Sequence, residues 1–322
     1  MEVVSKIFSL RDLNLAGNGL VGSLDESLIK LVNLETLDVQ RNSITALPNG
    51  LRDMVRLRVL KITENRFTSL PFEVLCQMPL IELLAAKNSL SGVLIAGNIE
   101  GLPQLKTLDI TCNALTNLTT SETLFLPALH QLSCSSNRLK ALPNMSSWVT
   151  LLTLAAEDNH IAAIPDGFVS LHKLKNVNLS GNDIKSLDDR IGTMNNLDIF
   201  RISGNPLREK KFSSMTTEDL KRALKARITD HIVDRNSDDG AFYSAQASPI
   251  PPRSPSEWPV KAGVLDRSNT QSHSLNPVTA ADAAANNIVK TLELHHNKFK
   301  EIPSSIAFFA ASLTTLNLAH NE

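Results

Sequence analysis

Asparagine returns along the first two thirds of the chain at an almost constant interval, and this repeat constrains the fold more than any other feature. Each asparagine closes the pattern L-x-x-L-x-L-x-x-N, and most are followed two positions later by an apolar residue. A period of about 20–50 residues predicts a solenoid, because one repeat cannot bury its apolar face alone. Nine such asparagines follow one another at steps of 22–25 residues: Asn18, Asn42, Asn65, Asn88, Asn113, Asn137, Asn159, Asn182 and Asn205.

The leucine pattern predicts the fold class, an α/β leucine-rich-repeat solenoid. Each repeat should form one short strand, such as residues 36–39, with leucines facing the core and polar residues facing a concave surface. Parallel neighbours stand about 4.8 Å apart, so nine repeats predict a curved sheet on the order of 40 Å wide. Leu-Pro and Ile-Pro pairs, beginning at Leu47, Leu70, Leu142 and Ile164, predict short helices or turns on the convex side.

The repeated asparagines are expected to form a structural ladder. A buried asparagine amide can donate to one backbone carbonyl and accept from a neighbouring N–H, which satisfies groups that the turn would leave unpaired. The pattern stops after Asn205 and returns with two further ladder residues, Asn297 and Asn321.

The interruption divides the chain into four predicted parts. Residues 1–207 form an array of nine repeats, and residues 208–233 form a capping helix that begins at a capping box of Thr216 and Asp219. Residues 234–287 are rich in Pro and Ser and predict a disordered linker, with two Ser-Pro motifs at Ser248 and Ser254. Residues 288–322 form two further repeats, which we expect either to be truncated or to stack on another surface, such as a partner chain.

The concave sheet is the expected binding surface, because repeat solenoids present this face to partners. Its residues are mixed in charge and lack an aromatic anchor, so we expect a polar, charge-matched protein partner. The candidate partner-binding residues are Asp38, Arg58, Lys61, Glu64, Lys87, Asp109, Glu157, Asp158, Asn178 and Arg201.

Composition narrows the class of partner and the compartment. The 32 basic and 33 acidic side chains balance, which gives no reason to expect a nucleic-acid partner. Neither a signal peptide at residues 1–9 nor a membrane span is expected, and the three cysteines fit a reducing compartment. We therefore expect a cytoplasmic or nuclear protein. Seven basic residues between 208 and 227 are interpreted as the solvated face of the capping helix, with an acidic or lipid partner as the alternative.

No motif predicts catalysis, a cofactor or a metal site. The chain lacks a Gly-rich phosphate loop, a Cys-x-x-Cys pair and a His-Glu-x-x-His motif. His295 and His296 are the strongest metal candidates, but adjacent residues at a strand end should point their rings apart. We expect a protein without enzymatic activity.

The junction between the repeats and the capping helix carries a family resemblance. Gly-Asn-Pro-Leu-Arg at residues 204–208, Leu-Lys-Arg-Ala-Leu-Lys at 220–225, and the stretches at 131–137 and 291–303 resemble the family of leucine-rich repeat-containing protein 40. The resemblance covers most of the chain and implies an intracellular interaction protein without known catalysis. The chain departs from that family by lacking most of the second array. The repeats also look like those of Ras-binding scaffolds and fungal adenylate cyclases, which contact small GTPases.

Three functional hypotheses follow. The first is a non-enzymatic scaffold that binds a protein on the concave face, in small-GTPase or phosphatase signalling. The second is the regulatory part of a larger signalling enzyme such as an adenylate cyclase. The third is an assembly role through an open end of the array at Asn321.

Overall fold

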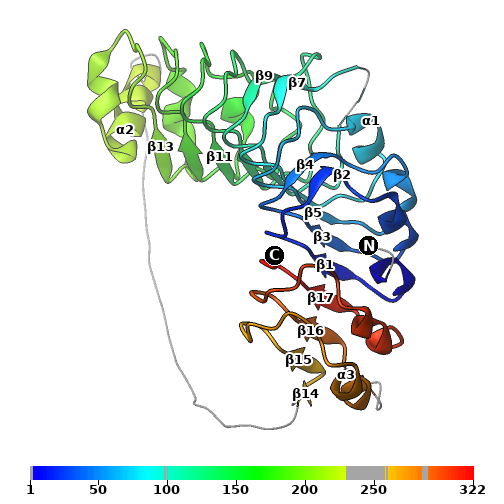
Figure 1. The fold of residues 1–322 in the computed structure, drawn as a ribbon. Coiled ribbons are helices and arrows are strands. Elements are labelled where there is room, and N and C mark those ends of the chain that lie inside the picture. The colour runs from blue at the N-terminus through cyan, green and yellow to red at the C-terminus, as the bar shows by residue number, and fades with distance from the viewer. Residues whose placement is uncertain (1–2, 98, 100, 230–257, 259, 285–288) are drawn as a thin grey trace.

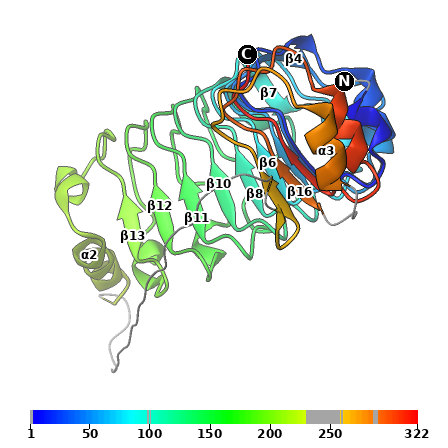
Figure 2. The ribbon, with the colours of Figure 1, turned by 60° about the horizontal axis from the view of Figure 1, so that its bottom comes forward.

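The computed structural model describes residues 3–97, 99, 101–229, 258, 260–284 and 289–322. These residues form the predicted leucine-rich-repeat solenoid, in which one 13-stranded sheet lines the concave side (Figures 1 and 2). All neighbouring strands are parallel except the hairpin at one edge. From end to end the order is β13 (Ile199–Arg201), β12 (Asn176–Asn178), β11 (Thr153–Ala155), β10 (Gln131–Ser133), β8 (Thr107–Asp109), β6 (Glu82–Leu84), β5 (Val59–Lys61), β3 (Thr36–Asp38), β1 (Asp12–Asn14), β17 (Thr315–Asn317), β16 (Thr291–Glu293), β15 (Val264–Asp266) and β14 (Val260–Lys261).

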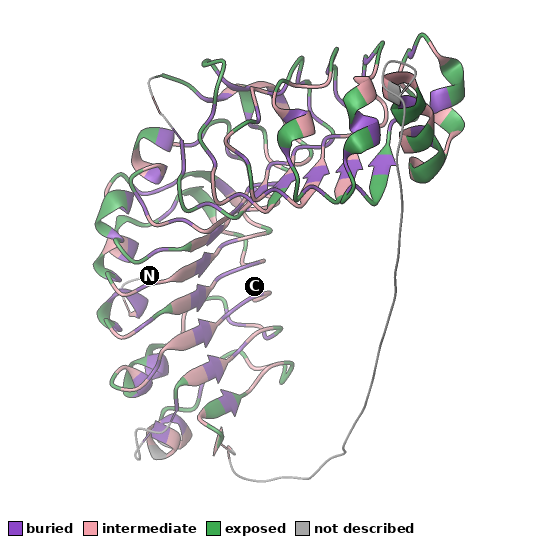
Figure 3. Ribbon diagram, turned by 180° about the vertical axis from the view of Figure 1, so that it is seen from behind, coloured by how far each residue is buried: buried purple, intermediate pink, exposed green. Residues whose placement is uncertain are grey.

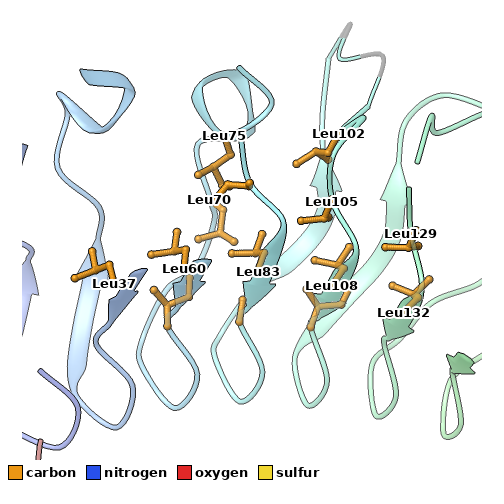
Figure 4. Packing of buried hydrophobic residues seen from close by; sticks show 14 of the residues in the cluster. Leu37, Leu60, Leu70, Leu75, Leu83, Leu102, Leu105, Leu108, Leu129 and Leu132 are labelled. Carbon is orange, nitrogen blue, oxygen red and sulfur yellow. The ribbon is translucent and has the colours of Figure 1, made fainter. Parts of the chain in front are cut away.

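Apolar residues at the centre of the strands form the core, with leucine in most strands and Val177 and Phe200 in β12 and β13. Because side chains alternate across a strand, the central residue of these three-residue strands points inward while its two neighbours face the concave surface, and Figure 3 shows this alternation of burial. The inward leucines of successive strands stack in register (Figure 4). Each is at most 1% exposed, and such burial stabilises the fold by roughly 1.5–3 kcal/mol per side chain: Leu37, Leu60, Leu83, Leu108 and Leu132.

The ladder asparagines bond neighbouring turns to one another. The Asn42 Nδ2 donates to the Leu15 carbonyl at 3.0 Å and to the Val39 carbonyl at 2.9 Å, and its Oδ1 accepts from the Leu20 amide at 2.9 Å. One side chain therefore pairs backbone groups from two successive turns. Donation to backbone carbonyls and acceptance from an amide recur at Asn65, Asn88, Asn113, Asn137, Asn159, Asn182, Asn205, Asn297 and Asn321.

Asn113→Ala is expected to lower the free energy of unfolding by about 1–3 kcal/mol, the usual cost of orphaned buried polar groups. The change removes three donations, to the carbonyls of Ala85, Ile110 and Thr111, and leaves the Leu90 amide without its acceptor. Chemical denaturation followed by circular dichroism measures the effect. Asn49→Ala, on the exposed surface, is the matched control, and equal stabilities for the two variants would contradict the ladder.

The convex side carries short elements that close the core from behind. Two pairs of short strands run between adjacent turns, β2 (Val21–Ser23) with β4 (Ser43–Ala46) and β7 (Ser91–Ile95) with β9 (Ala114–Thr119). One helical turn, α1 (Phe72–Leu75), begins directly after Pro71, which fits the fixed backbone angle of proline. Six other turns use 3₁₀ helices: Val4–Lys6, Glu26–Lys30, Leu51–Asp53, Phe168–Ser170, Asp189–Thr193 and Ser304–Phe309.

A helical cap covers the end of the array beyond β13. It consists of a 3₁₀ helix, Lys210–Ser214, and of α2 (Thr217–Thr229), whose apolar stripe buries Leu220 and Leu224. The Asp219 amide donates to the Thr216 Oγ1 at 3.2 Å, which is the first bond of the predicted capping box, and the Thr216 hydroxyl donates to the Asp219 carboxylate at 2.7 Å in place of the second.

Basic side chains of the cap attach it to the last repeats. The Lys221 Nζ donates to the Leu197 carbonyl at 3.0 Å. Arg227 pairs with Glu209 and with Asp189, and its guanidinium lies 4.9 Å from the centre of the Phe212 ring. These contacts give part of the basic run a structural role within the chain, beyond the solvated face expected from its sequence.

The last two repeats do not form a separate, open-ended array. Strand β17 pairs in parallel with β1, and the Leu318 amide donates to the Asn14 carbonyl at 2.8 Å. The Asn321 amide donates to the Asn18 Oδ1 at 3.0 Å, so the ladder passes from the C-terminal repeats into the first repeat. The expectation of an open end at Asn321 is therefore wrong, because the last two repeats stack on another surface, the N-terminal repeat of the same chain (Figure 1).

The linker was placed too far along the chain. Residues 260–266 form the hairpin of β14 and β15, and β15 continues the sheet beyond β16. Pro277, which lies within the predicted linker, is the first residue of helix α3 (Pro277–Ala284) on the convex side, a position where its missing N–H costs nothing. The linker interpretation is wrong for the described residues 258 and 260–284, and residues 234–257, with both Ser-Pro motifs, lie outside the described part.

Candidate protein-binding surface

Strand register assembles a continuous row of side chains along the concave face, which we call the central column. It contains the last residue of each strand from β15 to β13, and the pairing places every member opposite the next. In spatial order the column is Asp266, Glu293, Asn317, Asn14, Asp38, Lys61, Leu84, Asp109, Ser133, Ala155, Asn178 and Arg201. Five candidate binding residues therefore share one line: Asp38, Lys61, Asp109, Asn178 and Arg201.

The Asp and Asn members of this column also have a structural role that sequence reasoning missed. The Asp109 Oδ1 accepts from the Thr111 amide at 3.0 Å, and the Asp38 Oδ1 accepts from the Gln40 amide at 3.1 Å. Each bond forms an Asx turn that ends the strand. The signal was present in the sequence, because Asp or Asn recurs at this strand position. The same bond to the amide two residues on is made by Asn14, Asn178, Asp266 and Asn317.

A second row lies at the ends of the strands, in the residue that precedes each ladder asparagine. These residues adopt positive φ, with glycine at some turns and side-chain-bearing residues at others. Candidates Glu64, Lys87 and Asp158 belong to this left-handed row, with φ of 57°, 52° and 54°. They therefore lie on the turns that follow the strands, next to the central column.

Charges of the left-handed row pair with one another. The Lys87 Nζ lies 2.8 Å from the Glu64 Oε1, and the Arg41 Nε lies 3.7 Å from the Glu64 Oε2. Hydrogen bonding from Lys87 lowers the pKa of Glu64, and the same contact raises the pKa of Lys87. The three exposed side chains form an alternating strip of charge at the rim of the concave face.

The two remaining candidates differ in surroundings. Arg58 is exposed and immediately precedes β5. Glu157 is half-buried, and its Oε2 has no hydrogen-bond partner among the described residues. The buried Ser135 Oγ, at the equivalent position of the preceding repeat, is likewise unpaired within the described part. Glu157 thus keeps one buried carboxylate oxygen unpaired within the described part of the chain.

The C-terminal repeats add an acidic region to the concave face that sequence reasoning missed. Asp266 and Glu293 lie in the central column beyond β1 and β17. Two hydrogen bonds from Ser268 lower the pKa of Asp266, and the Glu293 carboxylate accepts from the Asn317 Nδ2 at 2.6 Å. No local signal places these residues beside Asn14, because the contact joins opposite ends of the chain.

Three histidines meet where the C-terminal repeats join the first repeat. The Nδ1 atoms of His295 and His296 lie 2.8 Å apart, and the rings of His296 and His320 lie 4.6 Å apart. The expectation that His295 and His296 diverge is wrong, because His296 has a φ of 55°, which turns its side chain toward its neighbour. Burial, followed by the charges of His296 and Arg41, lowers the pKa of His320.

The described residues offer little support for a metal site, a membrane span or a reactive thiol. Within that part of the chain, no group of three or more His, Cys, Asp or Glu side chains has an arrangement that could hold a metal ion. The helices described there are too short or too polar to cross a membrane. Burial raises the pKa of the Cys134 thiol, with smaller contributions from Glu157 and Asp109, so this thiol stays protonated and unreactive at neutral pH.

Comparisons with known proteins agree on the repeat. Residues 8–67 match the leucine rich repeat family. Opticin of Mus musculus is 31% identical over 93 residues, 29% of this chain and 28% of opticin. Toll-like receptor 9 of Mus musculus is 34% identical over 134 residues, 40% of this chain and 13% of the receptor. The alignments thus span less than a third of the length of these relatives.

One solved structure supports the architecture over the whole chain. A leucine-rich-repeat protein of Leptospira interrogans superposes with a TM-score of 0.53 at 21% identity, covering 100% of this chain and 81% of that one. This likeness establishes the fold and leaves the partner to be identified.

Proposed function

We propose that the chain is a non-enzymatic scaffold that binds a protein partner on its concave face, in small-GTPase or phosphatase signalling within the cytoplasm or nucleus. The observation that carries the proposal is the central column, a polar row across twelve parallel strands in register. Leucine-rich-repeat domains generally serve protein–protein interaction, and the resemblance to the family of leucine-rich repeat-containing protein 40 supports an intracellular setting.

The distribution of charge favours a partner with a mixed polar surface. Acidic residues predominate where β15 and β16 end, while Lys61 and Arg201 supply positive charge further along the column. Charge-matched contacts of this kind chiefly set the association rate and exclude wrong partners. The column contains no aromatic residue, so a deep apolar anchor is not expected there.

Lys61→Glu and Arg201→Glu are expected to weaken partner capture by about tenfold or more, since reversing a charge at a matched interface costs several kcal/mol. Proximity labelling in the source cell, followed by direct binding to the recovered protein, measures the loss. Asp109→Asn tests an acid separately, because asparagine keeps the Asx turn that Asn14 and Asn178 make at this position.

Arg52→Glu on the convex 3₁₀ helix is the matched control and should bind like the wild type. Unchanged affinity in all three concave variants would remove the concave-face proposal. Binding to a panel of GTP-loaded small GTPases tests whether the partner belongs to that class. If no member of the panel binds, the small-GTPase part of the proposal is contradicted.

A second candidate is that these repeats regulate a larger signalling enzyme such as an adenylate cyclase. A segment like this chain can be a small part of a much longer protein, since the alignment covers only 13% of Toll-like receptor 9. The coding sequence downstream of Glu322 decides between the two. A cyclase or phosphatase domain there would favour the enzyme, and further repeats would favour the scaffold.

A further inference from the structure

The two shortest side chains of the central column stand next to each other in the middle of the first array. Ser133 ends β10 and Ala155 ends β11, and these two strands pair in parallel (Figure 2). Asp109 of β8 precedes them in the column and Asn178 of β12 follows them. The column is therefore lowest at β10 and β11, where the sheet is covered by the least side-chain volume.

Ser135 and Glu157 lie beside this low point, two residues further along their chains. The residues just before them, Cys134 and Ala156, are fully buried in the core. Because side chains alternate along an extended chain, Ser135 and Glu157 project on the same side as the central column. The Ser136 amide donates to the Glu157 carbonyl at 2.9 Å, which places positions 135 and 157 next to each other in neighbouring repeats.

Both of these side chains keep an unpaired oxygen atom. The Ser135 Oγ and the Glu157 Oε2 are buried, and neither has a hydrogen-bond partner among the described residues. Ser135 as a whole is only 4% exposed. The large majority of buried polar atoms have a partner, so an unpaired one calls for an explanation. Two such acceptors at equivalent positions of adjacent repeats indicate a hydrogen-bond donor that comes from another molecule.

Three carboxylates gather here without a cation. Burial raises the pKa of the Cys134 thiol most, and the charges of Glu157 and then Asp109 raise it further. Because both charges act on the same thiol, both carboxylates lie near it. The exposed Asp158 directly follows Glu157. None of these three acids forms an ion pair with another described residue, whereas Glu64, on the same rim as Asp158, pairs with two cations. We call Asp109, Ser135, Glu157 and Asp158 the acidic site.

A guanidinium group fits this arrangement better than a metal ion does. No group of three or more acidic, His or Cys side chains in the described part of the chain is arranged to hold a metal ion. Arginine presents five N–H donors in a planar fork, so one side chain can reach separated acceptors. Asp109 uses its Oδ1 for the Thr111 amide, which leaves its Oδ2 for a ligand. The terminal torsion of a glutamate is broad, so the Glu157 carboxylate can turn its buried oxygen toward an arriving donor.

We propose that the acidic site binds an arginine side chain of the protein partner, whose guanidinium donates to the carboxylates of Asp109 and Glu157 and to the Ser135 Oγ. This inference rests on the proposed function, because it names one contact that the partner makes on the concave face. The short side chains of Ser133 and Ala155 leave the aliphatic part of the arginine room to lie against the sheet. Arginine is also enriched among the residues that dominate binding energy at interfaces.

The probe is N-acetyl-arginine amide, titrated into the full chain and followed by the NMR shifts of the Ala155 methyl group and the Ser135 amide. We expect saturable shifts with a Kd on the order of 1–10 mM, the affinity of a few charge-assisted hydrogen bonds. N-acetyl-citrulline amide has nearly the same shape without the charge and should bind about tenfold more weakly or worse. No saturable shift with the arginine probe, or equal binding of both probes, would overturn the proposal.

Two variants test the unpaired oxygens. Glu157→Gln and Ser135→Ala should each weaken binding of the arginine probe by about threefold to tenfold. Neither change should lower the free energy of unfolding in urea, because neither oxygen has a bond within the described chain to lose. Asp53→Asn, an exposed carboxylate on the convex side, is the matched control and should bind like the wild type. Wild-type affinity in both variants, or a Ser135→Ala variant that is less stable and binds normally, would reject the site.

The probe experiment needs no partner protein, so its failure is distinguishable from failure of the concave-face proposal. If the arginine probe does not bind, the acidic site is removed, and the concave face keeps its own test with Lys61 and Arg201. For a partner recovered by proximity labelling, Glu157→Gln should weaken binding by about tenfold. Unchanged affinity of that partner for Glu157→Gln would overturn the proposed arginine contact, even where the charge reversals at Lys61 and Arg201 abolish capture.

Discussion

Leu316→Asp is expected to separate residues 258–322 from the rest of the solenoid while leaving residues 3–229 folded. Leu316 is fully buried in β17 and stands opposite Leu13 of β1 and Leu292 of β16. An unpaired carboxylate at that point costs several kcal/mol. The N-terminal repeats keep their own core and the α2 cap, so the loss should be confined to the strands beyond β1.

Limited proteolysis with mass spectrometry measures this separation. Cleavage between residues 289 and 322 should accelerate about tenfold or more, since proteolysis follows the population of open states, and a protected fragment within residues 3–229 should remain. Small-angle scattering should report a larger radius of gyration. Ala311→Asp places the same charge at an exposed position nearby and should leave both measurements unchanged. A wild-type cleavage pattern for Leu316→Asp would show that β17 does not pack on β1.

Trp148→Ala is expected to lower the free energy of unfolding by about 3–5 kcal/mol, the range for emptying a large aromatic site. Trp148 is fully buried, and its Nε1 donates to the Leu124 carbonyl at 2.7 Å. It occupies the place that Met54 holds in its own turn, because the Leu151 amide donates to the Trp148 carbonyl as the Leu57 amide does to the Met54 carbonyl. One indole ring thereby fills the core of its repeat.

Trp148→Phe separates the ring from its hydrogen bond. Phenylalanine keeps most of the buried area and removes the indole donation, while the Leu124 carbonyl keeps its bond from the Ser147 Oγ at 3.1 Å, so we expect a smaller loss of about 0.5–1.5 kcal/mol. Urea denaturation followed by far-UV circular dichroism suits both variants, since it does not depend on tryptophan emission. A loss below about 1 kcal/mol for Trp148→Ala would mean that this site collapses or is already hydrated.

The local pattern of the chain was sufficient to predict the solenoid and the line of the central column. Both depend on a single rule, the alternation of side chains across a three-residue strand. Leu37 points into the core and Asp38 faces the concave surface, and the equivalent residues of the other repeats follow the same rule. The Asx turns could also have been predicted, because Asp38 and Asp109 stand two residues before the amides that they bind. The role of the column in partner binding stays a prediction.

The position of the C-terminal repeats could not be predicted in the same way. Pairing of β17 with β1 depends on surfaces that exist only after both ends have folded, and no residue near Leu316 encodes the distant strand. The repeat at β15 was missed for a different reason. It has Leu265 in its strand but Thr270 where a ladder asparagine would be expected, and the Thr270 amide and hydroxyl instead donate to the Asn297 Oδ1.

The pairing of β1 with β17 changes how this chain must assemble. Most repeat solenoids contain only contacts between neighbours in sequence, so folding propagates from turn to turn as the chain emerges from the ribosome. Here the Asp12 carboxylate accepts a hydrogen bond from Thr315, across a separation of 303 residues. Closing so long a loop adds an entropic barrier that local repeats avoid. Strand β1 therefore keeps one edge unpaired until residues 315–317 have been synthesised and have folded.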